Sequence, residues 1–172
     1  MAYILVWFSK TIPKAAFILW LAIKNRLGTQ DRLHIAFSDP KCLLYSTHME
    51  IHRHLFFECN VTKLIWTSVL HKCHTTYPSM HWDDYISWLS GEWKAKSLMV
   101  TIRKLCLAST VYTIWAERNS RYHNNSIRDT SIIIASIFEL NRLKLSTLSK
   151  VKDNALNRAI QQDWALLDTI FT

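Results

Sequence analysis

Glycine and proline are scarce in this chain, which has two glycines and three prolines among its 172 residues. Sheet proteins of this size need many tight turns, and these two residue types dominate such turns. Hydrophobic residues make up 49% of the chain and charged residues 20%, so a packed core can form. The composition therefore predicts a mainly α protein with polar loops, and at most a short hairpin, near residues 41–54.

Hydrophobic periodicity predicts several helices. The first begins at Pro13 and ends near Leu27, before Gly28, and its apolar character on almost every face is typical of a buried central helix. Thr29 is expected to cap a short helix from Asp31 to Leu33. The later helical or aromatic segments are 55–70, 82–89 with Trp93, 94–119, 132–145 with Asp129 as cap, and an amphipathic stripe of Leu156, Ile160, Trp164, Leu167 and Phe171.

The chain is basic, with a formal net charge of +8 and a pI of about 9.5. Lysine and arginine bind polyanions by displacing counterions from phosphates. The basic residues are spread along the chain without a dense run. A nucleic-acid-binding face and an ordinary basic surface both remain open at this point.

Four cysteines, Cys42, Cys59, Cys73 and Cys106, are unevenly spaced and do not form the framework of a secreted disulfide protein. The apolar run from Ala15 to Ile23 lacks a small-residue cleavage site and is shorter than the ~20 residues that span a bilayer. We therefore expect a reducing, intracellular compartment and no membrane partner.

The ordered residues from Pro13 to Trp66 resemble the reverse-transcriptase zinc-binding domain of plant LINE-type non-LTR retrotransposons. That family begins with a Pro-Lys, Phe-x-x-Trp-Leu helix, continues with a Cys-x2-Cys pair, and then has a His-Leu-Phe-x-x-Cys phrase and an aromatic Trp. The matching residues are Pro13, Lys14, Phe17, Trp20, Leu21, Leu27, Thr29, Arg32, Leu33, Cys42, His54, Leu55, Phe56, Phe57, Cys59 and Trp66. A second phrase, Tyr112, Ile114, Trp115, Glu117, Arg118 and Asn119, resembles one that often follows the domain.

The resemblance implies two regions, a reverse-transcriptase zinc-binding-like domain over 1–75 and a helical extension over 76–172. It also implies zinc ligands at Cys42, His54 and Cys59 within a zinc-knuckle-like loop. The family's second cysteine is replaced by Tyr45, whose phenol is a poor zinc ligand near neutral pH. His48 or His52 is a candidate for the fourth position, and we expect zinc binding weakened by the missing cysteine.

No catalytic machinery is recognisable in the sequence. The Tyr-x-Asp-Asp motif of reverse transcriptases and a glycine-rich phosphate loop are both absent. The pair Asp83–Asp84 is interpreted as a helix cap, and Cys73 between His71 and His74 has no supporting motif. We therefore predict that the chain is not an enzyme.

Two functional hypotheses remain. In the first, the chain is a non-catalytic accessory module that binds RNA or DNA, as the family resemblance implies. Its candidate phosphate contacts are Lys14, Lys24, Arg26, Arg32, Arg118, Arg121 and Arg128. In the second, the chain is a degenerate solo remnant that acts as a helical protein-interaction module through its amphipathic C-terminal helix.

Overall fold

The computed structural model describes residues 2–33, 40–76 and 81–172. Within these ranges the chain is built from helices, and the single β-bridge found there joins Lys41 to Met49. The elements are α1 (Tyr3–Val6), α2 (Pro13–Ile23), the π-helical turn η1 (His54–Glu58), α3 (Asn60–Lys72), α4 (Trp82–Glu92), α5 (Leu98–Asn124), α6 (Thr130–Leu145), α7 (Ala155–Asp163) and the 3-10 turn η2 (Asp168–Phe171). The mainly α prediction is confirmed, and in the described ranges no helix is long and apolar enough to cross a membrane.

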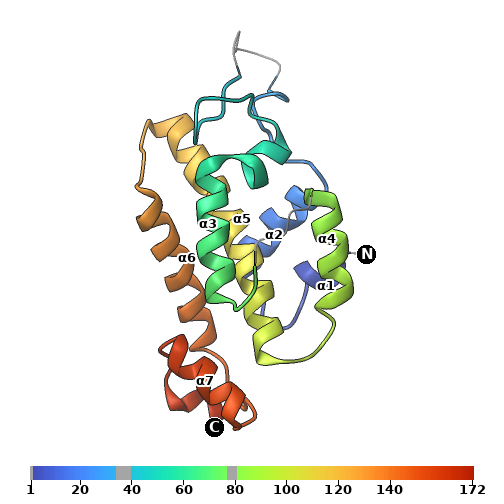
Figure 1. The fold of residues 1–172 in the computed structure, drawn as a ribbon, viewed down its shortest axis with the longest axis vertical. Coiled ribbons are helices and arrows are strands. Elements are labelled where there is room, and N and C mark those ends of the chain that lie inside the picture. Colours follow the sequence, from blue (N-terminus) through green and yellow to red (C-terminus); the bar gives the residue numbers. More distant parts are fainter. Residues whose placement is uncertain (1, 34–39, 77–80) are drawn as a thin grey trace.

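Helix α5 is the axis of the molecule and packs against α2, α3 and α6 (Figure 1). Every residue from Lys104 to Val111 is buried, so all faces of α5 are covered over that stretch. The sequence predicted this central role for the helix that starts at Pro13, and that prediction was wrong. Helix α2 packs on α5 through a face rich in small residues such as Ala15 and Ala22, while Phe17 is 51% exposed.

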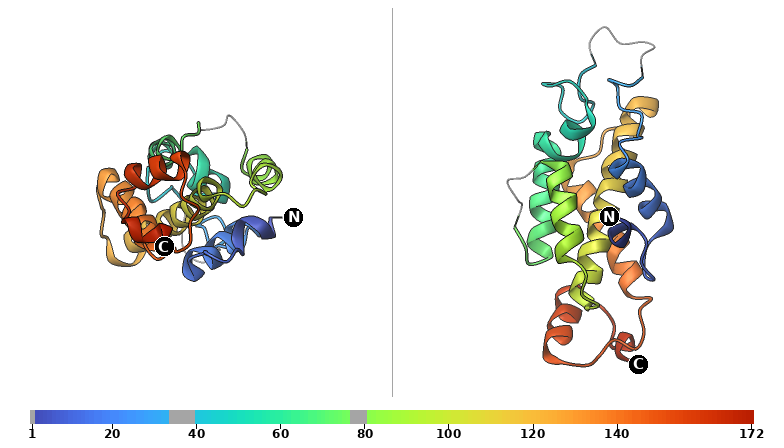
Figure 2. Two further views of the ribbon diagram at one scale, coloured as in Figure 1. Left: turned by 90° about the horizontal axis from the view of Figure 1, so that it is seen from below. Right: turned by 90° about the vertical axis from the view of Figure 1, so that its right-hand side faces the viewer.

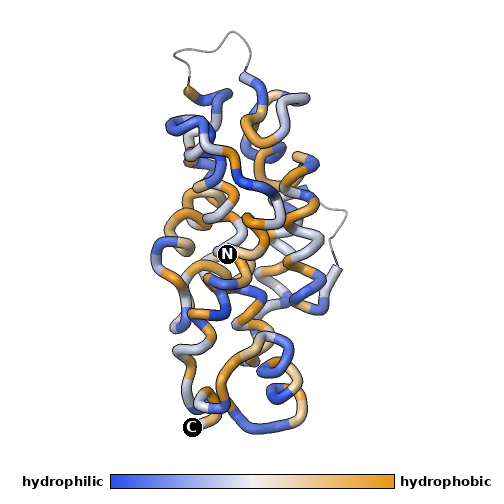
Figure 3. Tube along the Cα trace, turned by 90° about the vertical axis from the view of Figure 1, so that its left-hand side faces the viewer, coloured by the Kyte–Doolittle hydropathy of each residue, from blue (hydrophilic) through white to orange (hydrophobic). Residues whose placement is uncertain are grey.

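The molecule is elongated, with the segment 40–58 at one end of its long axis and α7 at the other (Figures 1 and 2). Apolar and polar positions recur along the helices (Figure 3), as expected for helices that bury one face and expose the other. The middle of α5, which is buried on all faces, is the exception. One hydrophobic core includes residues from both sides of position 75. The boundary between a domain 1–75 and an extension 76–172 remains a prediction, but the two regions share this core.

The first long helix ends earlier than predicted. It stops at Ile23, and Asn25 takes a left-handed conformation with φ of 51°. Asparagine tolerates this left-handed conformation, so the chain can leave the helix at Asn25 without a glycine, and Gly28 is not needed to end it. The hydroxyl of Thr29 donates to Asp31 at 2.5 Å within a turn, and the short helix expected there does not form.

The segment predicted as one helix over 55–70 is two elements, because the backbone is extended at Cys59 with ψ of 134°. Its predicted inward residues are confirmed as buried: Leu55, Cys59, Ile65, Trp66 and Leu70. Farther on, Trp82–Glu92 is one continuous helix. Asp83 and Asp84 lie in its first turn rather than at its cap position, which is His81.

The later helices follow the prediction until the C-terminus. Asp129 caps α6 by accepting the backbone N–H of Ser131 at 2.8 Å, as expected. The C-terminal stripe does not form one helix, because α7 ends at Asp163 and Ala165 has a φ of 48°. Leu167, beyond this turn, is 68% exposed, and Leu156 in the first turn of α7 is 64% exposed.

Candidate metal centre

A π-helical turn brings His54 and Cys59 together. In such a turn the N–H of residue i+5 donates to the carbonyl of residue i, and here Cys59 N–H donates to His54 O at 2.8 Å. Ideal α-helical geometry would rotate residue i+5 by about 140° away from residue i. Four residues separate His54 from Cys59. The π turn brings these two side chains to the same side, which an ideal α-helix would not do.

The loop after Lys41 supplies the third side chain. Cys42 N–H donates to the carbonyl of His48 at 2.8 Å, and the bridge between Lys41 and Met49 closes the same loop. Cys42 thus lies at the base of a small closed loop that faces η1. The loop is the observed counterpart of the predicted knuckle.

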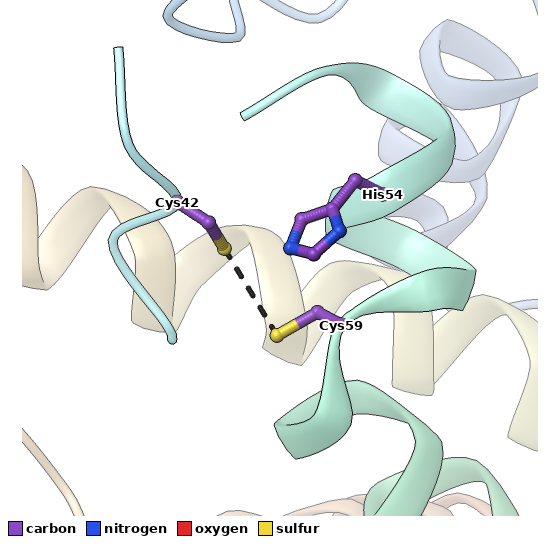
Figure 4. Close-up of side chains that lie close together, drawn as sticks. All are labelled: Cys42, His54 and Cys59. Carbon is purple, nitrogen blue, oxygen red and sulfur yellow. Dashed lines mark hydrogen bonds between the residues drawn. The ribbon is translucent and has the colours of Figure 1, made fainter. Parts of the chain in front are cut away.

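Cys42, His54 and Cys59 form one compact cluster (Figure 4). Their potential ligand atoms all lie within 4.8 Å of one another, and the two sulfur atoms are 3.9 Å apart. Two sulfurs that each lie ~2.3 Å from a tetrahedral zinc ion are roughly 3.8 Å apart. The same separation is about twice a disulfide bond length, and all four cysteines of the chain are free thiols.

The cluster is shielded from solvent. Cys42 and Cys59 are fully buried and His54 is 5% exposed. The Nε2 atom of His54 is buried without a hydrogen-bond partner among the described residues. Because an unpaired buried nitrogen is costly, this atom and the two thiols fit a metal ion as their missing partner.

The two thiols differ in acidity. The hydrogen bond from Cys42, helped by the amide N–H groups of Thr62 and Val61 at the start of α3, lowers the pKa of Cys59 to about 6. The same contact with Cys59, together with burial, raises the pKa of Cys42. Cys59 is therefore the thiolate of the pair, and a metal ion would displace the proton that Cys42 keeps.

The three residues discussed for the fourth position lie differently. Tyr45 is 43% exposed. Its backbone N–H bonds to Cys42 and opposes, without cancelling, the rise in the pKa of that thiol. The ring of His48 stacks on His54 with 5.2 Å between centroids. His52 instead packs against Phe56 and Trp82, and burial lowers its pKa to about 4.

A buried ion pair, which the sequence did not reveal, anchors the loop to α5. Glu50 is fully buried and accepts hydrogen bonds from Arg118 Nε at 2.9 Å and Nη2 at 2.7 Å. The same carboxylate accepts the amide N–H groups of Gln30 at 3.0 Å and Leu43 at 3.3 Å. Glu50 therefore connects the end of the α2 region, the cysteine loop and α5.

Glu117 forms a second anchor on the same helix. Burial alone raises the pKa of Glu117, but hydrogen bonds from Arg128 and Arg121 lower it below the ordinary value of 4.5 overall. Arg121 also donates to the carbonyls of Leu43 and Leu44 at 3.1 Å. The segment of α5 around Glu117 and Arg118 thus holds the cysteine loop in place.

The seven predicted phosphate contacts separate into two groups. Arg118 is 2% exposed and pairs with Glu50, while Arg121 and Arg128 share the single carboxylate of Glu117, so most of the positive charge of this group is compensated inside the protein. The group near α2 is exposed: Lys14, Lys24, Arg26 and Arg32.

Comparison with known proteins supports this interpretation of the site. Residues 2–66 match the model of a family described as zinc-binding in reverse transcriptase, and the match contains all three clustered residues. The match indicates a zinc-binding region derived from a retrotransposon reverse transcriptase, and the helices after Trp66 lie outside it. No curated protein and no solved structure gave a significant match.

Proposed function

We propose that the chain is a non-catalytic accessory module from a plant LINE-type polyprotein that binds zinc through Cys42, His54 and Cys59 and also binds nucleic acid. The observation that carries the proposal is the buried three-residue cluster with sulfur atoms 3.9 Å apart. Zinc would cross-link the cysteine loop to the start of α3. Its role is then structural, because the cluster is buried and no carboxylate belongs to it.

Nucleic-acid binding rests on charge and on the family. The net charge is +8, and Lys14, Lys24, Arg26 and Arg32 are exposed. The matched family is described by its place in reverse transcriptase, an enzyme that works on RNA and DNA. Because no recognition helix or ribbon is evident, we expect binding through the phosphate backbone without preference for sequence.

A fluorescence-anisotropy titration tests this part of the proposal. Labelled single strands of unrelated sequence, as RNA and as DNA, should bind the zinc-loaded protein with similar affinity. Binding should weaken as salt is raised. A plot of the logarithm of the binding constant against the logarithm of the salt concentration should fall linearly, and each phosphate contact should add about 0.7 to the steepness of its slope. No rise in anisotropy at low salt would exclude nucleic-acid binding, and a strong preference for one sequence would contradict the backbone mode.

A second candidate function is a protein-interaction module. The exposed Leu156 and Leu167 near the C-terminus are the observation behind it, because apolar side chains are stabilised when a partner removes them from water. This alternative predicts no binding to either nucleic acid in the same titration. It also predicts that changing both leucines to serine abolishes association with the partner.

A further inference from the structure

A second candidate site lies at the end of α5 that is remote from the cysteine cluster. It is a cavity of about 690 Å³ between the segment after α1, the first two turns of α5 and the segment 148–157. This volume is within the roughly 300–1,000 Å³ range of ligand sites. Helix α5 has 27 residues, so its two ends are roughly 40 Å apart. The cavity lies at its first turns and the cysteine loop beside its last turns, so the two sites are well separated.

Half of the twelve lysines of the chain meet at this cavity. They come from three separate segments, which explains why no basic run is visible in the sequence. They are Lys10, Lys94, Lys96, Lys104, Lys150 and Lys152. Among the described residues that line the cavity, none is acidic.

Acidic residues elsewhere neutralise arginines rather than these lysines. Glu50 pairs with Arg118, Glu117 pairs with Arg121 and Arg128, and Asp153, next to the cavity, pairs with Arg158 at 2.5 Å. Among the described residues, the six cavity lysines form no ion pair. By contrast, the exposed Arg32 near α2 shares its surface hollow with Asp31, Asp83 and Asp84.

Lys104 is the most informative member of the group. Its side chain is only 6% exposed, and burial lowers its pKa. Its ammonium lies 5.7 Å from the centre of the Phe8 ring, and no hydrogen bond or ion pair joins it to another described residue. The ammonium of this largely buried residue therefore faces the cavity without an anionic partner, and an anion that enters the cavity can pair with it.

The cavity also has apolar walls and two helix N-termini. Ile4, Leu98 and Val151 line it together with Phe8. The first turns of α5 and α7 also face it through Ser97 and Asn154, and helix N-termini attract anions. An occupant should therefore combine several negative groups with a flat or apolar moiety.

We propose that this cavity is where the protein binds single-stranded nucleic acid, with successive phosphates on the lysines and one base inserted against Phe8. A single carboxylate would use only one of six lysines, whereas a strand presents a phosphate at every nucleotide. Aromatic stacking and a basic track are the usual means of holding single strands. This inference rests on the proposed nucleic-acid function and gives it a location that the sequence did not predict.

The test compares two triple variants with the same loss of charge. One removes exposed cavity lysines (Lys94→Ser, Lys96→Ser, Lys152→Ser), and the other removes exposed cations of the α2 region (Lys24→Ser, Arg26→Ser, Arg32→Ser). Labelled single strands are titrated with each full-length, zinc-loaded protein. The cavity variant should bind at least about ten-fold more weakly at low salt, and its salt slope should fall by about 2, since each phosphate contact contributes about 0.7. The α2 variant should lose less than about three-fold.

Two further variants examine the interior. Lys104→Met should weaken binding without lowering the urea midpoint, because it removes a buried charge and keeps the length of the side chain. Phe8→Leu should reduce affinity for strands but not for inorganic polyphosphate, which has no base to stack. Circular dichroism checks that all variants remain folded.

The outcomes separate this inference from the function on which it rests. If the wild-type protein binds strands and only the α2 variant loses affinity, the cavity is excluded and nucleic-acid binding stands. Equal losses in both triple variants would also overturn the inference. If the wild-type protein binds no strand but binds vesicles of anionic lipid, both the cavity assignment and the nucleic-acid function are wrong.

Discussion

Replacing Arg118 with methionine should remove the cation that is buried against Glu50 and leave its carboxylate fully buried with only amide donors. The pair is 2.7 Å apart, and the exposed fractions of its side chains are 2% and 0%. Removal of one partner of a buried ion pair costs about 3–5 kcal/mol, because the remaining charge is uncompensated. Methionine still packs against Trp115, over which the guanidinium now lies. We therefore expect a loss of about 3–5 kcal/mol, a large share of the typical 5–15 kcal/mol of a domain.

Urea denaturation followed by circular dichroism measures this loss, and Arg142→Met is the matched control. Arg142 pairs with Glu139 on the surface, with exposed fractions of 42% and 51%, so its removal should cost only about 0–1 kcal/mol. Adding Glu50→Gln to Arg118→Met should recover part of the loss, because the neutral amide no longer needs a cation. Equal losses for Arg118→Met and Arg142→Met, or no coupling in the double variant, would refute the anchoring role of this pair.

Three further predictions concern the metal and pH. Tyr45→Cys should tighten zinc binding and release an additional proton, measured by chelator competition in weak buffer, and unchanged affinity would mean that Tyr45 is not at the fourth position. His48→Ala should weaken zinc binding more than His52→Ala in the same competition, since His48 stacks on His54 while His52 packs on Phe56 and Trp82. Glu117 has a lowered pKa in the folded protein, so its contribution to stability is present above the ordinary value of 4.5 and is lost as pH falls below it. Glu117→Gln should therefore flatten the decline in unfolding free energy between neutral and acidic pH, and an unchanged decline would show that other carboxylates cause it.

Local patterns allowed much of the fold to be predicted from the sequence. The Asp129 cap and the buried face from Leu55 to Leu70 depend on neighbouring residues, and both agree with the structure. The helix end at Ile23 and the break at Cys59 were missed, because asparagine and cysteine adopt these conformations without a distinctive signal. The left-handed turn at Ala165, which interrupts the C-terminal stripe, has even less of a sequence signal, because alanine rarely adopts this conformation.

The candidate site also has parts that local sequence patterns predict and parts that they do not. Cys42, His54 and Cys59 were predicted from a family motif, and the structure brings them together. The pairing of Glu50 with Arg118 spans 68 positions, so no local pattern contains it. The sequence motif around Arg118 predicts a phosphate contact, whereas in the structure Arg118 is buried against Glu50. The convergence of lysines on one cavity likewise needs three-dimensional information.

Zinc analysis of the purified protein tests the central claim most directly. Protein prepared under reducing conditions with added zinc, and then freed of excess metal, is analysed by mass spectrometry beside Cys59→Ser and the control Cys106→Ala. Cys106 is buried in α5 outside the cluster, so its replacement leaves the metal ligands intact. We predict about one zinc ion per chain in the wild-type and control proteins, and a loss of most zinc in Cys59→Ser, as expected for a site of this ligand type. Wild-type protein without zinc, or equal zinc in all three proteins, would contradict the assignment of Cys42, His54 and Cys59 as the metal centre.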